Sequence, residues 1–254
     1  MRNALWVFMI GALLVSICLV GLAQEEKFAT PMPGFGFGGP MIGLFVLDLG
    51  SGDDQATVNG ILAENGYATL PNRIITFGGG GGGGVIGSMS FGGRGWGGSI
   101  DSLREGKKAE LSLGFGGMDI AYVVGGNEQA LLLIGAVLGG GGLDLKLRNR
   151  IPTSFEDAVA DPTSTTLSRG FFGAEPYVRF QIQPFDWLGF EFHLGYLFTL
   201  VGNWEEGGQE LAGPTLEVSG SFIGLSIAFG GIGETDMAED IEEILEEVPE
   251  DTEG

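Results

Sequence analysis

The 254-residue chain has few thiols, few imidazoles and few cations. It contains one cysteine, Cys18, one histidine, His193, and 12 lysines and arginines against 33 aspartates and glutamates. One thiol cannot form an intrachain disulfide, and one imidazole cannot build a histidine-rich metal site. The net charge of −21 makes the polyanionic backbone of nucleic acid an unfavourable partner. We therefore expect no nucleic-acid partner, no disulfide and no metal centre.

The first 23 residues have the pattern of a secretory signal peptide. Arg2 precedes an uncharged, largely apolar run over 4–21, and Gly21 and Ala23 are small residues at the positions that a signal peptidase reads. Cleavage after Ala23 would remove Cys18 and leave a mature chain without a thiol. Two alternatives remain open, namely an uncleaved membrane anchor and lipidation at Cys18. The pattern predicts a protein that leaves the cytoplasm.

Glycine is the residue in largest excess, with 49 copies. It lacks the triplet period of collagen and is interleaved with Phe, Leu, Ile and Val, so the chain must bury, or embed in lipid, a large apolar surface. Along the chain we expect a Pro/Gly linker over 24–40, one β-domain over 41–230 and an acidic tail over 231–254.

The tail is strongly acidic. It holds eleven carboxylates and no base between Glu234 and Glu253, while Met237, Ile241 and Val248 recur at helical spacing. Two interpretations follow. A self-repelling segment without fixed structure is one, and a short amphipathic helix that docks onto another envelope protein is the other.

Apolar side chains alternate with polar ones over long stretches of the C-terminal half. A period of two that is maintained for a dozen residues is typical of a strand and is incompatible with a helix. The alternation is clearest over 172–182 and 188–200. Together with the turn residues it predicts eight strands, over 41–49, 72–77, 85–92, 108–124, 130–148, 170–183, 187–200 and 214–229.

The connections between these strands differ in length. We expect short turns on one side, with the seven glycines over 78–84 as one of them, and long polar connections on the other side, including 93–108. A short helix is predicted in the first long connection, over 53–65, with Ser51 as its cap and Gly66 as its end.

The hairpin pattern over 175–196 (EPYVRFQIQPFDWLGFEFHLGY) and the aromatic-ended last strand over 222–229 resemble small bacterial outer-membrane β-barrel proteins. The resemblance is clearest in the C-terminal half and brings no catalytic residue with it. It implies an all-β, antiparallel up-and-down barrel of about eight strands, with the lipid bilayer as its partner. A barrel of this size is filled by side chains and is no general pore.

A soluble alternative remains open. Residues 131–138 are apolar at both odd and even positions, as in a sheet that is covered on both faces. A β-sandwich, or a sheet covered by the helix near Asp53, would explain this pattern. The alternative function is that of a secreted or periplasmic glycine-rich β-protein with a binding role.

Polar residues of the alternating strands are candidates for the barrel interior. Adjacent hairpin strands would bring Glu175, Arg179, Glu191, His193 and Glu217 onto one interior face, and we expect Arg179 to pair with these carboxylates. The set is predicted to be structural.

No other motif points to catalysis or to a cofactor. The Gly-x-Gly-x-x-Gly match over 82–87 lies in a glycine run that no helix follows, and no Gly-Lys-Ser/Thr is present. We predict no catalytic residue and no cofactor, and expect a structural or surface-interaction protein of the outer membrane.

Overall fold

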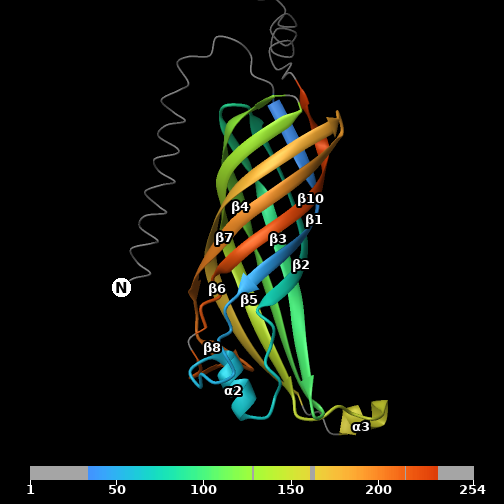
Figure 1. Cartoon of the computed structure of the whole chain (residues 1–254), viewed down its shortest axis with the longest axis vertical. Coiled ribbons are helices and arrows are strands. Elements are labelled where there is room, and N and C mark those ends of the chain that lie inside the picture. Colours follow the sequence, from blue (N-terminus) through green and yellow to red (C-terminus); the bar gives the residue numbers. More distant parts are fainter. Residues whose placement is uncertain (1–33, 128, 161–163, 215, 234–254) are drawn as a thin grey trace, which may run out of the picture.

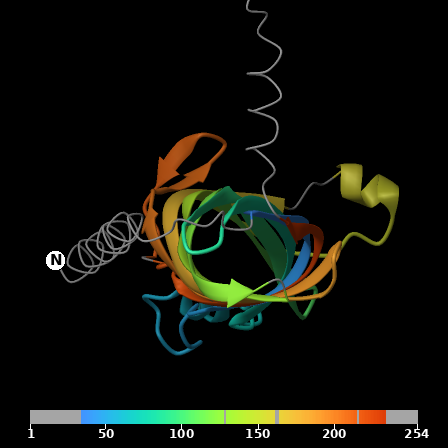
Figure 2. The ribbon, with the colours of Figure 1, turned by 90° about the horizontal axis from the view of Figure 1, so that it is seen from above.

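A computed structural model describes residues 34–127, 129–160, 164–214 and 216–233, which form a closed barrel of eight antiparallel strands (Figure 1). Pairing of β1 with β10 and of β5 with β6 closes the sheet on itself, as the view along the axis shows (Figure 2). Closure leaves the barrel without a free strand edge. The predicted eight-stranded all-β barrel is confirmed. The barrel strands are β1 (Gly34–Leu47), β2 (Arg73–Val85), β3 (Met89–Arg104), β4 (Lys107–Asn127), β5 (Ala130–Arg148), β6 (Ser164–Phe185), β7 (Leu188–Val201) and β10 (Gly220–Gly233).

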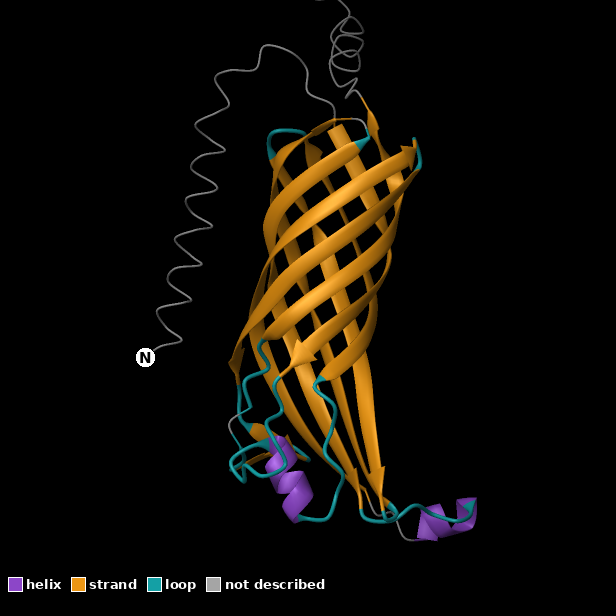
Figure 3. Ribbon diagram, viewed as in Figure 1, coloured by secondary structure: helices purple, strands orange, loops and turns teal. Residues whose placement is uncertain are grey.

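The two ends of the barrel differ. Short turns join β2 to β3, β4 to β5 and β6 to β7 at one end, where Gly34 also pairs with Gly233; we call this the turn end. The long connections 48–72, 149–163 and 202–219 lie at the opposite, loop end (Figure 3). The predicted long connection over 93–108 is wrong, because most of it belongs to β3.

The β3–β4 connection is instead a tight turn at the loop end. Its two central residues, Glu105 and Gly106, have φ angles of +50° and +83°. Positive φ at both central positions is typical of a type I′ turn, whose twist matches that of the strands it joins.

The glycine run over 78–84 is strand and not turn, which corrects the sequence interpretation. Gly82 pairs with Phe37 of β1 and with Gly92 of β3. Glycines have no side chains, so residues 78–84 show no alternation of apolar and polar residues. Their main chain nevertheless pairs with β1 and β3 as in any other strand. A Cβ atom on Gly82 would lie 2.6 Å from the carbonyl oxygen of Phe91, so the close approach of the two strands requires glycine.

The N-terminal boundary of the barrel needs the same correction. Strand β1 begins at Gly34, so residues 34–40 of the predicted linker are part of the barrel. This segment is also rich in glycine, and its alternation is equally weak. The predicted signal peptide lies outside the described residues, and so do residues 234–254 of the predicted acidic tail, whereas residues 231–233 of that tail belong to β10.

Helix α2 (Val58–Glu64) lies in the first long connection, where a helix is predicted, but it begins later than expected. Thr57, and not Ser51, is the N-cap, because its Oγ1 accepts a hydrogen bond from the Gly60 amide at 3.1 Å. Gly66, with a φ of +78°, follows the helix as predicted.

Three short elements were not predicted, since each is too short to show a period. They are α3 (Phe155–Ala160), β8 (Trp204–Glu206) and β9 (Gln209–Leu211); the last two form a hairpin next to β6. In the part of the chain that the structure describes, no helix has the length and apolar character needed to cross a membrane.

Strands β3 to β6 continue past the other strands at the loop end and form a feature that we call the extended wall (residues 99–104, 107–112, 143–148 and 164–169). Its inner face is apolar, with Leu111 and Leu145 buried, and packs against Val58 and Leu62 of α2. The outer face is polar apart from Leu103, with residues such as Lys146. The wall and α2 therefore extend the hydrophobic core of the lumen beyond the barrel.

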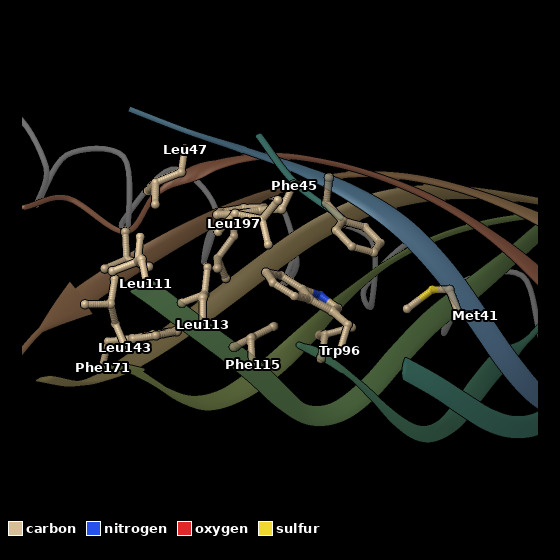
Figure 4. Packing of buried hydrophobic residues seen from close by; sticks show 14 of the residues in the cluster. Met41, Phe45, Leu47, Trp96, Leu111, Leu113, Phe115, Leu143, Phe171 and Leu197 are labelled. Atoms are coloured by element: carbon tan, nitrogen blue, oxygen red, sulfur yellow. The ribbon is translucent and has the colours of Figure 1, made fainter. Parts of the chain in front are cut away.

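The lumen in the loop-end half of the barrel is filled by aromatic rings and leucine side chains (Figure 4). Trp96 stacks on Phe222 at a centroid distance of 4.9 Å and contacts Phe45 at 4.9 Å. An eight-stranded barrel is only wide enough for side chains, so large rings need small residues opposite them. Gly43 is such a residue, since a Cβ atom there would lie 2.6 Å from Cζ of Phe222 and 2.7 Å from Oγ1 of Thr76.

We predict that Gly43→Ala destabilises the barrel by about 1–3 kcal/mol, the usual effect of overpacking a dense core. Gly36→Ala, on the same strand, is the matched control, because a Cβ atom there meets nothing within 4 Å. Urea unfolding in detergent measures both variants. Equal midpoints for the two would contradict the packing argument.

Candidate functional site

Charged and polar side chains from four strands meet in the lumen beside the aromatic layer. Each is at most 7% exposed. We call this set the lumen network; it consists of Arg94 on β3, Asp119 on β4, Glu175, Tyr177 and Arg179 on β6, and Glu191 and His193 on β7.

Two arginines and two carboxylates form the centre of the lumen network. Arg94 Nη2 lies 2.7 Å from Glu191 Oε1, and Arg179 Nη1 lies 2.9 Å from Asp119 Oδ2. Longer contacts of 3.5 Å (Arg94 Nε to Asp119) and 3.7 Å (Arg179 Nε to Glu191) join the two pairs. Buried charges are tolerated when they are paired and hydrogen-bonded, and these four sum to zero.

Glu175 connects the lumen network to the aromatic layer. Its Oε1 lies 2.8 Å from His193 Nε2, and its Oε2 accepts a hydrogen bond from Trp96 Nε1 at 3.1 Å. Gly195 makes room for this carboxylate, because a Cβ atom there would lie 2.6 Å from Oε1. The Tyr177 hydroxyl donates a hydrogen bond to Asp119 Oδ1. Polar and aromatic parts of the lumen thus form one continuous core.

Of the five residues predicted for the interior, the structure brings together Glu175, Arg179, Glu191 and His193. Glu217 is not among them: it precedes β10 and its side chain is exposed. Leu216, Val218 and Phe222 are buried, and Ile223, Leu225 and Ile227 are exposed, so Glu217 lies on the outer face. Alternation shows that Glu217 faces away from Leu216 and Val218, but it does not show which of the two faces is inside.

Sequence reasoning missed Arg94, Asp119, Tyr177 and the indole of Trp96. For the two charged residues, Arg94 and Asp119, the sequence did contain a usable signal. Arg94 is the only charged residue between 86 and 100, and Asp119 is the only one between 111 and 127. An isolated charge in a long glycine-rich or apolar strand points to a partner across the lumen.

The outer face of the barrel is covered by apolar side chains. Strand β5 shows how the two faces differ: Leu131 and Leu133 are fully buried in the lumen, and Leu132 between them is 38% exposed. This explains why residues 131–138 are apolar at every position. A soluble sandwich is not needed. Members of this apolar belt are 38–66% exposed and include Ile42, Ile75, Phe77, Phe91, Met118, Leu132, Phe172, Val178, Phe180, Ile182, Phe190, Phe192, Leu194, Leu200, Ile223, Leu225, Ile227 and Phe229.

The belt has two notable sectors. Near the turn end, Trp187 lies 6.4 Å from the ring of Phe185 and 6.3 Å from that of Phe229. Aromatic clusters of this kind occur at the membrane interfaces of barrels.

On β2 to β5 the belt is interrupted by glycines in register, because Gly79 pairs with Gly95, Gly95 with Gly116, and Gly116 with Gly140.

The loop end carries an exposed helix. Phe155 and Val159 of α3 are 80% and 65% exposed. The helix is held by Asp157, which accepts hydrogen bonds from Arg150 Nη1 and Nη2 at 2.7 and 2.8 Å and from the Thr153 amide at 2.9 Å. Hydrogen bonds from the Arg150 guanidinium and, with a smaller effect, from the Thr153 amide hold the pKa of the Asp157 carboxyl well below its ordinary value of 3.8.

A closed antiparallel barrel with an apolar outer face resembles the outer-membrane β-barrel proteins, as the sequence predicted. Among the described residues, no group of three His, Cys, Asp or Glu side chains could hold a metal ion. No family model matches the sequence, and no curated protein matches it either.

Solved structures with a similar fold include Ail, the attachment invasion locus protein of Yersinia pestis, alone and in complex with the heparin analogue sucrose octasulfate. Both match with 11% identity and a TM-score of 0.40 over 79% of this chain and 100% of that chain. The outer membrane protease OmpT from Escherichia coli matches with 10% identity and a TM-score of 0.29 over 81% and 98%. Likeness at this level carries no conclusion about activity.

We predict that Arg179→Met destabilises the barrel by about 3–5 kcal/mol, because it leaves Asp119 and Glu191 buried with one arginine between them. Arg104→Met is the matched control. Arg104 lies 3.8 Å from Glu105 in an exposed pair, and its loss should cost about 0–1 kcal/mol. Urea unfolding in detergent is the measurement. A loss for Arg179→Met no larger than that of the control would argue against a charge-balanced network.

The lowered pKa of Asp157 predicts how the α3 loop responds to acid. Its ionised carboxylate stabilises the loop fully above about pH 4, and this contribution is lost as the pH falls from there toward the pKa of the folded state. In a carboxyl-carbon NMR titration, Asp157 should still be ionised at about pH 3. Arg150→Gln should return its pKa toward 3.8; no movement in that variant would show that Arg150 is not the cause.

Proposed function

We propose that this protein is an outer-membrane protein whose eight-stranded barrel spans the bilayer and presents the loop end as a structural or interaction surface. The apolar belt is the observation that carries the proposal. Lipid offers no hydrogen-bond partners, so a sheet that spans it must close on itself and turn an apolar face outward. The predicted signal peptide over 1–23 agrees with an exported chain.

The alternative is a soluble secreted or periplasmic protein. It would leave Phe77, Phe190, Leu225 and their neighbours exposed to water. This exposure costs about 25 cal/mol of free energy for each Å² of apolar surface. Monomeric soluble proteins rarely expose a contiguous apolar surface of this extent. The belt therefore favours the membrane.

We infer that the barrel is neither a general pore nor an enzyme of the lumen. Trp96, Phe45 and Phe222 fill the cross-section, and the lumen network is at most 7% exposed. Beside the network, between Arg94, Arg179 and the glycines of β2, the free volume is about 20 Å³. That is room for one water molecule, and too little for a substrate.

The interaction surface that we propose is α3 and the neighbouring tip of the extended wall. Phe155 and Val159 point away from any core and give a partner an apolar contact. An acidic tail that docks onto another envelope protein remains a second, separate prediction, since residues 234–254 of the tail lie outside the described residues.

Labelling of intact cells tests both the location and the orientation of the barrel. Phe155→Cys, at the loop end, should react with a membrane-impermeant maleimide. Asp186→Cys, in the exposed β6–β7 turn at the turn end, is the matched control and should react only after the outer membrane is permeabilised. Labelling of both sites in intact cells, or of Asp186→Cys alone, would contradict a barrel that spans the outer membrane with its loop end facing the cell exterior.

Fractionation of the wild-type protein tests the membrane location by itself. We expect it in the membrane fraction, released only by detergent, with heat-modifiable migration on a denaturing gel. Release into the soluble fraction without detergent would favour the secreted or periplasmic alternative.

A further inference from the structure

An apolar cavity of about 330 Å³ lies at the loop end, between the extended wall, α2 and the β8–β9 hairpin. We call it the cap cavity. Its volume falls in the range of small-molecule sites, roughly 300–1,000 Å³. Side chains from all three elements line it, among them Val58 and Leu62 of α2, Leu145 and Leu167 of the wall, and Trp204 and Leu211 of the hairpin.

The cap cavity exists because the wall is covered from two sides that are each fixed in place. Helix α2 is anchored by Asn59, whose Nδ2 donates to the carbonyl oxygens of Gly50 and Leu70 at 3.1 Å and whose Oδ1 accepts from the Leu70 amide at 2.8 Å. Trp204 is anchored by its Nε1, which donates to the Pro214 carbonyl at 3.0 Å. The Arg169 guanidinium lies 5.5 Å from the centre of the Trp204 ring. The hydrogen bonds fix the shape of each covering segment, and the Arg169 contact holds Trp204 against β6.

The lining determines what the cavity can bind. Its side chains are aliphatic except for Trp204, and the one polar side-chain atom among them, the indole nitrogen, already has its partner. A ligand would find no side-chain hydrogen bond inside, so the part that enters must be hydrocarbon. The open side lies by Leu211 and Ala212, which are both exposed, so a polar head group could remain in water there.

Strand β1 begins and β10 ends at the turn end, where Gly34 pairs with Gly233. In the proposed function the bilayer lies between that end and the cap cavity, and on that basis the occupant comes from outside the chain. At about 30 Å³ for a group the size of water, the cavity holds a hydrocarbon chain of on the order of ten carbons.

We propose that the cap cavity binds the hydrocarbon tail of a medium-chain fatty acid and leaves its carboxylate at the open side by Leu211. The site is preformed, because α2 and Trp204 are held independently of any ligand. Binding at this site does not require the interaction role proposed for α3, and either can fail without the other.

Decanoate with a bromine on its last carbon is a suitable probe, because bromine quenches indole fluorescence at short range and Trp204 lines the cavity. The protein is assayed in lipid nanodiscs in a Trp187→Phe background, since Trp187 is 62% exposed on the belt and would respond to probe dissolved in the bilayer. Trp96 is buried in the lumen, and Trp6 lies in the predicted signal peptide. We expect saturable quenching of Trp204.

Two variants test the site. Leu167→Asn keeps nearly the same shape but puts an amide into the lining, and Ala212→Phe narrows the open side; each should weaken binding by about tenfold or more. Ala56→Phe makes the same change on an exposed position of the first long loop outside the cavity and should bind as the parent does. Heat-modifiable migration verifies that each variant is folded.

The parent protein alone can overturn the proposal. Quenching that rises linearly with probe and never saturates would show partition into the bilayer only. Saturable quenching that is equal in the parent, Leu167→Asn, Ala212→Phe and Ala56→Phe would place the bound probe elsewhere. In either case the cap cavity is not a fatty-acid site, while the labelling of Phe155→Cys and Asp186→Cys is unaffected.

Discussion

The narrow lumen of an eight-stranded closed sheet is the constraint on which the rest of this structure depends. Every inward side chain must fit a cross-section that only side chains can fill. Large groups are therefore placed opposite glycines: the Phe222 ring lies over Gly43, and the Glu175 carboxylate lies over Gly195. Gly141, Gly173 and Gly224 make room for lumen side chains in the same way, whereas a Cβ atom on most of the other closely packed glycines would meet the main chain of a neighbouring strand.

The same constraint governs charge. A lumen without bulk water cannot hold an unpaired ion, and the two arginines of the lumen network are matched by Asp119 and Glu191. The chain as a whole carries −21, so the balance inside is local and independent of the acidic surface and tail. The extended wall, where the sheet continues beyond the barrel, does not enclose a lumen. Its inner face is covered by α2 and a hairpin, and the cap cavity is the part that they leave uncovered.

Much of the barrel was predictable from sequence because lipid and lumen impose opposite demands on alternate residues. Strands β6 and β7 carry that alternation in full, and their pairing put Arg179 beside His193 and Gln181 beside Glu191. The glycine strands were not predictable in this way, because residues 78–84 have no side chains to alternate. Glu217 precedes β10, and alternation alone does not show which face of this stretch is inside; the stacking of Phe222 on Trp96 determines that, and no local pattern records it. The partners of Arg94 and the arrangement of α2 and the β8–β9 hairpin over the wall depend in the same way on contacts between distant segments.

The glycines of the outer face have a consequence for the surroundings of the barrel. Strands β7 and β10 turn rings and branched side chains outward, whereas Gly79, Gly95, Gly116 and Gly140 form a row with none. In a bilayer, acyl chains would touch peptide groups along this row, while Phe77 and Phe91 on the same strands would hold them a side chain's length away. The closest contacts between lipid and main chain would therefore follow the line of these four glycines.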